Sequence, residues 1–289
     1  MTSDPIAWQS LLIVPLADCR YIDKAPSRGA DAIVLDLEDG VALERKAEAR
    51  GHLAEASQRL RAAGCTVLVR VNASVELCVA DLEAACRAGL SCILLPKVES
   101  VAALDALEPE LQRLEALAAP GMPSVQWLAL LETPAGVMQA SAIAAHPRVV
   151  GLAFGSEDYS AALGVPSHMA ELAWPAQAVA VAARAQGLAA FGVPGTITDF
   201  SDFVAFEALV RRARAMGFTG CMGIHPGQVA AARRAFEPTA DEIATAQGIV
   251  QAAATADYAE RGVVGWQGRM VDAPVVAQAR RVLQRAGLA

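Results

Sequence analysis

Three carboxylates follow one short apolar run of the sequence. The segment AIVLDLEDGV, residues 32–41, begins like a buried strand and then places Asp36, Glu38 and Asp39 within four positions. Carboxylates this close repel one another, and each loses hydration on burial. The cluster therefore indicates a positive countercharge nearby, and a bound divalent cation would supply one.

Polar residues also follow several other apolar runs. They are Arg70 and Asn72, Lys97, Glu132 and Thr133, residues 156–158, and His225. Glu132 and Asp158 follow neighbouring runs, so their carboxylates can meet at one point. Two carboxylates with water and a chelating substrate form an octahedral Mg²⁺ or Mn²⁺ site. The sequence has no His-x-x-x-His pair or cysteine cluster of the kind that binds zinc.

The apolar runs alternate with helical patterns along most of the chain. Candidate strands are residues 11–14, 32–37, 66–71, 92–96, 125–131, 149–154, 188–193 and 220–224. Near-continuous apolar runs are typical of parallel strands buried on both faces, so the pattern predicts a (β/α)8 TIM barrel. An open doubly wound sheet is the alternative, but no G-x-G-x-x-G turn follows the first run. In a barrel the carboxyl ends of the strands meet at one face, which would bring the polar residues together.

The last fifty or so residues have a different pattern. Thr239 and Glu242 have the spacing of a capping box before an amphipathic helix. A glycine-punctuated loop and a final helix follow, and that helix begins near Asp272 and ends at Gly287. We therefore expect a barrel over residues 1–236 and a helical extension over residues 237–289.

Composition excludes several classes of protein. The net charge is −7 and no dense Lys/Arg run is present, which argues against a nucleic-acid partner. The longest apolar runs are too short to cross a bilayer, and the first ten residues lack a signal-peptide pattern. The six cysteines are scattered, with no CxxC pair. These features predict a cytoplasmic protein that binds neither membranes nor nucleic acid.

Each polar residue also has a simpler structural explanation. Asp39 and Asp158 could cap the helices that follow them, and Asp272 could cap the final helix. Arg70 could be an ion-pair partner, and His225 could fix a turn before Pro226. Several acids and one arginine at the same barrel end favour a functional site over these separate explanations.

The motifs together resemble one enzyme family. They are AIVLDLEDGV, VLVRVN, ILLPKVES, LALLETPAGV, GLAFGSEDYSAALG, GIHPGQV and GRMVDAPVVAQARRVL. In this order they are similar to the citrate lyase β-chain-like proteins of the HpcH/HpaI aldolase superfamily, over nearly the full chain. The resemblance implies a Mg²⁺-dependent (β/α)8 carbon–carbon lyase that forms a homotrimer or hexamer. Its substrate would be a 3-hydroxyacyl-CoA, cleaved to acetyl-CoA and a 2-oxo acid.

The resemblance also implies roles for individual residues. Glu132 and Asp158 match the metal ligands, and Arg70 matches the residue that binds the oxo-acid carboxylate. The acids of residues 36–39 match a strand end that holds metal-bound water and orients its neighbours. Asp272 matches an acid that malyl- and citramalyl-CoA lyases place over the site of a neighbouring subunit, and the resemblance makes it the candidate catalytic acid/base.

Departures from the family pattern leave alternatives open. Gln9 stands where arginine is usual, and Cys221 stands where lysine is common. These changes affect the part of the pattern expected to bind the thioester carrier. The chain could therefore be an aldolase acting on a free hydroxy acid, or a non-catalytic subunit that binds an oxo acid or CoA.

Overall fold

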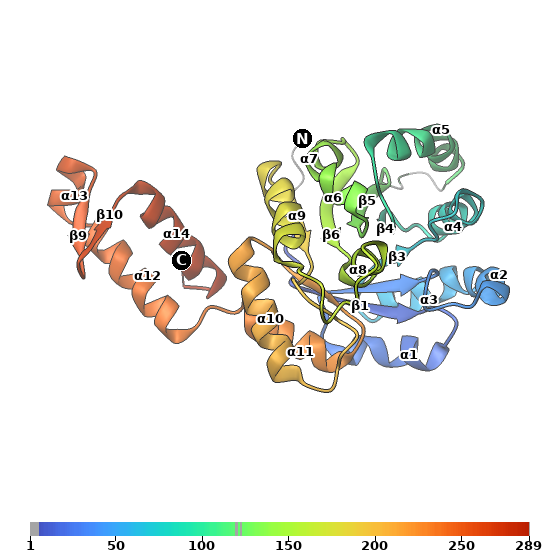
Figure 1. Ribbon diagram of the computed structural model, residues 1–289, viewed down its shortest axis with the longest axis horizontal. Coiled ribbons are helices and arrows are strands. Elements are labelled where there is room, and N and C mark those ends of the chain that lie inside the picture. Colours follow the sequence, from blue (N-terminus) through green and yellow to red (C-terminus); the bar gives the residue numbers. More distant parts are fainter. Residues whose placement is uncertain (1–5, 119–120, 122, 289) are drawn as a thin grey trace. The chain divides into compact units, whose positions relative to one another are not determined.

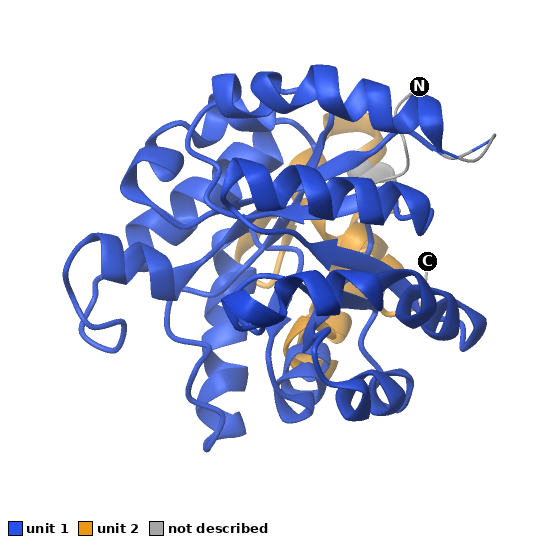
Figure 2. Cartoon of the chain, turned by 90° about the vertical axis from the view of Figure 1, so that its right-hand side faces the viewer, with its two compact units in different colours: residues 1–234 blue, residues 235–289 orange. Residues whose placement is uncertain are grey.

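The computed structural model describes residues 6–118, 121 and 123–288 (Figure 1). The chain divides into two compact units, residues 1–234 and 235–289 (Figure 2). Each unit is described separately below.

Unit 1 contains eight parallel strands in a nearly closed barrel. They are β1 (Ser10–Pro15), β2 (Ala32–Asp36), β3 (Thr66–Arg70), β4 (Cys92–Leu95), β5 (Gln126–Leu131), β6 (Val149–Phe154), β7 (Ala189–Phe191) and β8 (Cys221–Gly223). Each strand pairs with the next from β1 to β7, and β1 also pairs with β8. A bridge between Phe191 and Gly220 links β7 to the start of β8. The predicted (β/α)8 barrel is confirmed.

Helices connect the strands and surround the barrel (Figure 1). In chain order they are α1 (Cys19–Lys24), η1 (Ala25–Arg28), η2 (Leu43–Arg45), α2 (Lys46–Gly51), α3 (Leu53–Ala62), α4 (Val75–Arg87), α5 (Val101–Leu117), α6 (Pro134–Met138), α7 (Ala140–Ala144), α8 (Ser156–Ala162), α9 (Ala173–Ala185), α10 (Phe203–Met216) and α11 (Pro226–Phe236). The strands are short and almost wholly buried, as their continuous apolar runs predict.

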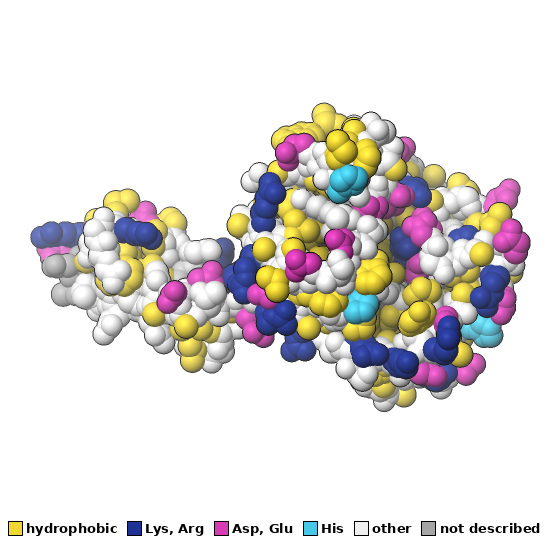
Figure 3. Space-filling model, turned by 60° about the horizontal axis from the view of Figure 1, so that its bottom comes forward, with side chains coloured by type: hydrophobic (Ala, Val, Ile, Leu, Met, Phe, Trp, Pro, Cys, Tyr) yellow, Lys and Arg dark blue, Asp and Glu magenta, His cyan; other side chains and the backbone are white. Residues whose placement is uncertain are grey.

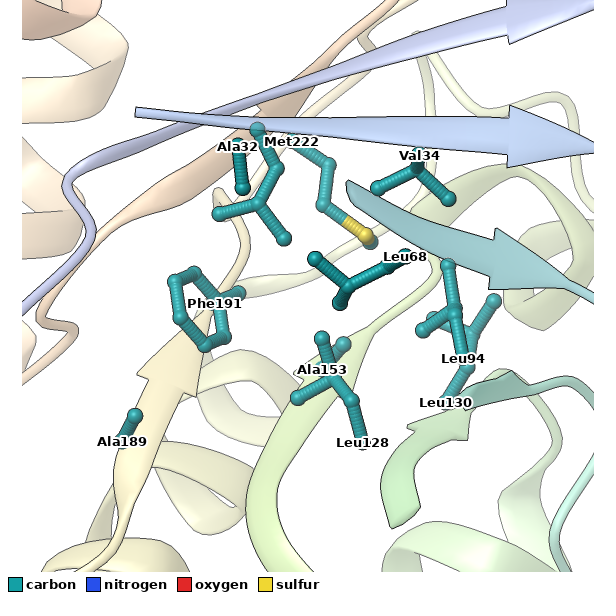
Figure 4. Packing of buried hydrophobic residues seen from close by; sticks show 11 residues of the cluster. Ala32, Val34, Leu68, Leu94, Leu128, Leu130, Ala153, Ala189, Phe191 and Met222 are labelled. Carbon is teal, nitrogen blue, oxygen red and sulfur yellow. The ribbon is translucent and has the colours of Figure 1, made fainter. Parts of the chain in front are cut away.

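The alternation of side chains along each strand determines which residues reach the site. Ala32 and Val34 of β2 belong to the apolar cluster inside the barrel, together with Leu68, Leu94, Leu128, Leu130, Phe191 and Met222 (Figure 4). Side chains two apart on a strand share a face. Asp36 therefore follows Val34 into the barrel interior, Arg70 follows Leu68, and Glu132 follows Leu130. The apolar cluster is thus the floor beneath these charged residues.

Unit 2 is a helical pair with a small hairpin. It comprises α12 (Ala240–Ala253), α13 (Ala256–Arg261), β9 (Val264–Trp266), β10 (Arg269–Val271) and α14 (Ala273–Arg285). Helices α12 and α14 pack through Ala246, Ala279 and Leu283. The capping box predicted at Thr239 and Glu242 is present. The hairpin turns at Gln267 and Gly268, which both have positive φ, as type I′ turns require.

The surface is mixed in charge. On the face shown in Figure 3, basic and acidic side chains are interspersed among exposed apolar ones. Within residues 6–118, 121 and 123–288, no helix has both the length and the apolar character needed to cross a membrane.

Candidate active site

Arg70 is the centre of the acidic cluster at the carboxyl ends of β2 and β3. Its Nε and Nη2 atoms donate to the two carboxylate oxygens of Asp36, at 2.7 and 2.8 Å. Its Nη1 atom lies 3.0 Å from Glu38 Oε2 and donates to Asp39 Oδ2 at 3.1 Å. Three acids thus share one guanidinium, which supplies the countercharge that their spacing in the sequence requires.

The Asp36–Arg70 pair is buried and held in place. The carboxylate of Asp36 also accepts the backbone N–H groups of Glu38 and Gly40, at 2.9 and 2.8 Å. A Cβ atom at Gly40 would lie 2.6 Å from Asp36 Oδ2, so only glycine fits there. Burial alone would lower the pKa of Arg70, but the hydrogen bonds and charge of Asp36 raise it above its ordinary value. The guanidinium therefore stays charged and fixed in orientation.

Glu132 is a buried carboxylate directly after β5. It is 4% exposed, and its Oε1 atom accepts the backbone N–H of Lys97 at 2.9 Å. Burial raises the pKa of Glu132, and the nearby charges of Glu38 and Asp158 add to this effect, so that the pKa is about 8. Burial likewise raises the pKa of Glu38 to about 7. Carboxylates that hold protons this firmly suit a divalent cation, which would take the place of the proton.

Asp158 and Lys97 form a more open part of the mouth. Asp158 lies in the first turn of α8, and its Oδ2 atom pairs with Lys97 Nζ at 2.9 Å. The same ammonium lies 3.5 Å from Glu38 Oε1. The side chains of Lys97 and Asp158 are 40% and 37% exposed, whereas that of Arg70 is 11% exposed. Water therefore reaches the Lys97–Asp158 pair much more freely than it reaches Arg70.

Arg70, Glu132 and Asp158 line one cavity of about 270 Å³. The remaining walls are largely apolar: Ile13, Leu130, Phe154, Val193, Ile197, Met222 and Ile224. Among the described residues, no group of three or more His, Cys, Asp and Glu side chains is arranged to hold a metal ion. A Mg²⁺ ion here would take carboxylate oxygens from Glu132 and Asp158 and complete its shell with water or substrate oxygens. The buried, proton-holding Glu132 fits such an ion.

The capping explanation for Asp39 and Asp158 is wrong. The N-cap of η2 is Ala42 and that of α8 is Gly155, and neither makes a side-chain capping bond. Asp39 instead pairs with Arg70, and Asp158 pairs with Lys97. Both acids are therefore held by basic side chains at the cavity rather than by helix ends.

Two other predicted residues have local structural contacts. Asp272 belongs to unit 2 and caps α14, since its Oδ1 atom accepts the N–H of Val275 at 3.3 Å. Its catalytic role stays a prediction. His225 fixes a turn, because its Nδ1 atom accepts the N–H of Gly227 at 3.0 Å. Its ring also stacks on those of Phe200 and Phe203, with centroids 5.2 and 5.3 Å away.

Two polar residues that support the mouth, the half-buried Lys46 and the buried Gln228, were not predicted from the sequence. Lys46 donates to the carbonyl oxygens of Leu37 and Glu38, at 3.0 and 2.8 Å, and so fixes the acidic turn after β2. Gln228 is fully buried and links two loops. Its Oε1 atom accepts the N–H of Ile224 at 2.8 Å, and its Nε2 atom donates to the carbonyl of Ile197 at 2.7 Å. A lysine and a glutamine within helices give no periodic signal, so their patterns resemble solvated positions.

Comparison with known proteins identifies the family. Residues 9–226 match the profile of the HpcH/HpaI aldolase/citrate lyase family. The chain belongs to this family. The citrate lyase subunit beta of Escherichia coli K12 is 34% identical over 284 residues, which cover 97% of this chain and 93% of that protein. A (3S)-malyl-CoA thioesterase of Cereibacter sphaeroides is 35% identical over 282 residues, 96% of this chain and 94% of that protein.

A solved structure agrees with the fold over almost the whole chain. It is protein CitE from Mycobacterium tuberculosis in complex with magnesium, acetoacetate and coenzyme A. The identity is 32%, the TM-score is 0.79, and the match covers 97% of this chain and 98% of that chain. Together with the family match, these similarities place the chain in the citrate lyase β-subunit-like part of the family.

Proposed function

We propose that this protein is a Mg²⁺-dependent carbon–carbon lyase. Its substrate would be a 3-hydroxyacyl-CoA whose hydroxyl carbon bears a carboxylate, such as citryl-, malyl- or citramalyl-CoA. Cleavage would give acetyl-CoA and a 2-oxo acid. The observation that carries the proposal is that Arg70, Glu132 and Asp158 line one cavity. A guanidinium and a carboxylate pair together meet the needs of an anionic, metal-chelating substrate.

Arg70 would bind the carboxylate of the oxo-acid fragment. Asp39 is the acid that can give way to it, because its side chain is 62% exposed and makes one bond of 3.1 Å to Nη1. Asp36 would stay in place, because its oxygens hold Arg70 and two backbone N–H groups in a buried setting. The arginine would therefore exchange an exposed partner for the substrate without changing its own orientation.

Glu132 and Asp158 would hold the magnesium ion. When bound, the ion supplies Lewis-acid polarisation of the substrate hydroxyl and carboxylate oxygens. The apolar walls at Leu130, Phe154 and Met222 exclude water, which strengthens the charge interactions of Arg70 with the substrate.

The bond that breaks joins the hydroxyl-bearing carbon to the α-carbon of the thioester. The hydroxyl gives its proton to solvent water at the mouth and becomes the 2-oxo group, and the electron pair of the broken bond passes to the thioester as an enolate. The enolate then takes up a proton to give acetyl-CoA. Asp272 is the residue we propose to exchange this proton. We propose that unit 2 of a neighbouring copy supplies Asp272, as the resemblance to malyl- and citramalyl-CoA lyases implies, so the proposal includes a homotrimer or hexamer.

The relatives support the proposal in two ways. One solved CitE structure holds magnesium and coenzyme A together with acetoacetate, a 3-oxo acid, and another holds magnesium and pyruvate, which is a 2-oxo acid of the kind that the proposed reaction releases. The relative from Escherichia coli is named as a subunit of citrate lyase, and the proposed activity is also that of a lyase. The sequence departures at Gln9 and Cys221 leave the residues of the proposed metal and carboxylate sites unchanged.

The test is an assay of the purified chain with each of the three thioesters, with Mg²⁺ or with EDTA. We expect Mg²⁺-dependent release of a 2-oxo acid, detected as its hydrazone, with the thioester bond kept in acetyl-CoA. Release of free CoA without an oxo acid would instead show that the chain is a thioesterase. One of the relatives has that name. Cleavage of only the free hydroxy acids would show an aldolase that needs no CoA. No turnover of any substrate would leave a binding subunit as the better description.

Two variants test the assigned residues. Glu132→Ala should lose activity and Mg²⁺ binding together, and full activity would refute the metal assignment. Asp272→Asn should lower turnover while Mg²⁺ binding stays unchanged. Unchanged turnover in Asp272→Asn would leave that residue with only its helix-capping role.

A further inference from the structure

Lys97 contacts three acids at the mouth of the cavity: Glu132, Asp158 and Glu38. Its backbone N–H donates to Glu132 Oε1 at 2.9 Å. Its ammonium pairs with Asp158 Oδ2 at 2.9 Å and lies 3.5 Å from Glu38 Oε1. One residue thus holds one proposed metal ligand by its main chain and the other by its side chain.

The backbone of Lys97 has an unusual conformation that the neighbouring strand maintains. Its φ is 53°, in the left-handed region that residues other than glycine rarely adopt. The N–H of Lys97 bonds to Glu132, and the next N–H, that of Val98, bonds to Leu130 O at 3.2 Å. These two hydrogen bonds, one to Leu130 of β5 and one to Glu132 just after β5, hold the backbone of Lys97 and Val98 in place. The backbone therefore fixes where the Lys97 side chain begins, and from there its ammonium reaches Asp158.

A cation held by Glu132 and Asp158 must share Asp158 with this ammonium. Two positive charges on one carboxylate repel each other, and at a separation of a few ångströms the repulsion is substantial even in a partly solvated site. The Lys97 side chain is 40% exposed and has a flexible four-carbon stem, so it can move away from Asp158. This movement lets a metal ion bind to Asp158. Because displacing the ammonium costs free energy, the metal ion binds less tightly than it would without Lys97.

We propose that Lys97 is a positioning residue that acts as a tethered counter-ion of the metal ligands. It holds Asp158 and Glu38 in place by charge and competes with the divalent cation for Asp158. An anionic oxo acid would reduce the repulsion between the ammonium and the metal, so metal and oxo acid should favour each other's binding. This inference rests on the metal site of the proposed function.

The experiment measures Mn²⁺ binding to the full chain by isothermal titration calorimetry, without substrate. We expect Lys97→Met to bind Mn²⁺ at least tenfold more tightly than the unmodified chain. Its melting temperature in EDTA should be lower, because Asp158 and Glu38 lose their shared countercharge. Lys97→Gly removes the same ammonium, keeps the N–H bond to Glu132 and permits the positive φ. It should also tighten Mn²⁺ binding, and it serves where Lys97→Met folds poorly.

Lys24→Met is the matched control. It removes the same charge from the exposed last turn of α1, so Mn²⁺ affinity should stay within about twofold of the unmodified chain. Unchanged or weaker binding in folded Lys97→Met and Lys97→Gly would overturn the inference alone, provided the unmodified chain binds Mn²⁺ and Glu132→Ala does not. Absence of Mn²⁺ binding in the unmodified chain would overturn the metal site itself, and with it both proposals.

Discussion

The two sides of the cavity mouth balance buried acids in different ways. On the Arg70 side, which comprises Asp36, Glu38, Asp39 and Arg70, the base is buried and bonded to a buried Asp36 at two points. On the Lys97 side, which comprises Lys97, Glu132 and Asp158, the ammonium is 40% exposed and makes one close ion pair. The first arrangement keeps a fixed geometry, whereas the second can exchange its cation. A site that must both orient an anion and accept a metal needs one of each.

The largest expected effect comes from removing the fixed base. Arg70→Met leaves Asp36 and Glu38 buried without their countercharge, so we expect the free energy of unfolding to fall by about 3–5 kcal/mol. Urea unfolding followed by circular dichroism measures this. Arg59→Met is the control, because Arg59 pairs with Asp23 and both side chains are about half exposed. Arg59→Met should lower the free energy of unfolding by less than about 1 kcal/mol. Equal losses in the two variants would contradict the assignment of Arg70 as the buried countercharge of its side.

A smaller effect is expected from crowding each side with one methyl group. A Cβ atom at Gly40 would lie 2.6 Å from Asp36 Oδ2, and one at Gly155 would lie 2.6 Å from Glu132 Oε2. We expect each alanine variant to lose about 1–3 kcal/mol of stability. Gly155→Ala should also weaken Mn²⁺ binding, and Gly40→Ala should leave it nearly unchanged. Calorimetry and urea unfolding of both variants would show this split.

Gly51→Ala is the control for this pair. Gly51 is the last residue of α2, and no atom lies within 4 Å of a Cβ placed there. The free energy of unfolding of Gly51→Ala should be equal to that of the unmodified chain or slightly higher. If Gly40→Ala also weakened Mn²⁺ binding, the two sides would not be independent.

The last expected effect is the pH dependence of the metal-free chain. Burial raises the pKa of Glu132 to about 8 and that of Glu38 to about 7, from an ordinary value of 4.5. Both therefore bind protons more tightly when folded than when unfolded. Their contribution to stability is full below about pH 4.5 and is lost as pH rises through about 7 to 8. In EDTA, the free energy of unfolding should fall by about 1 kcal/mol or more over this range.

Urea unfolding of the chain and of Glu132→Gln at several pH values checks this slope. The variant cannot ionise at position 132, so its slope should be shallower. A rise in the stability of the unmodified chain over the same range would contradict the assignment of buried, proton-holding carboxylates to the Lys97 side.

Most of the fold could be predicted from the sequence, because strands buried on both faces leave continuous apolar runs. The predicted ends were less accurate at β7, where the run 188–193 continues past the strand. Gly192 has a φ of 149°, and this turn ends the strand although the sequence stays apolar. The apolar residues after β7 indicate that the segment is buried, but they do not indicate where the backbone leaves the strand conformation.

The acids and Arg70 could also be predicted as a group, since side chains at the ends of parallel strands converge. The role of Lys97 could not. It depends on a left-handed backbone at a residue other than glycine, which no propensity indicates. Gln228 was missed for a related reason. Its partners are backbone groups at Ile197, Ile224 and His225, and such bonds leave no charge pattern in the sequence.

The apolar layer beneath the charged residues has a consequence for traffic through the site. Leu68, Leu94, Leu128 and Phe191 fill the barrel below the mouth (Figure 4). Leu130 and Met222 belong to this layer and also line the cavity, so the apolar layer closes the lower end of the cavity among the described residues of unit 1. In the proposed reaction, neither fragment could leave through this layer, so the oxo acid bound at Arg70 would leave toward the mouth, after the thioester fragment that lies outside it.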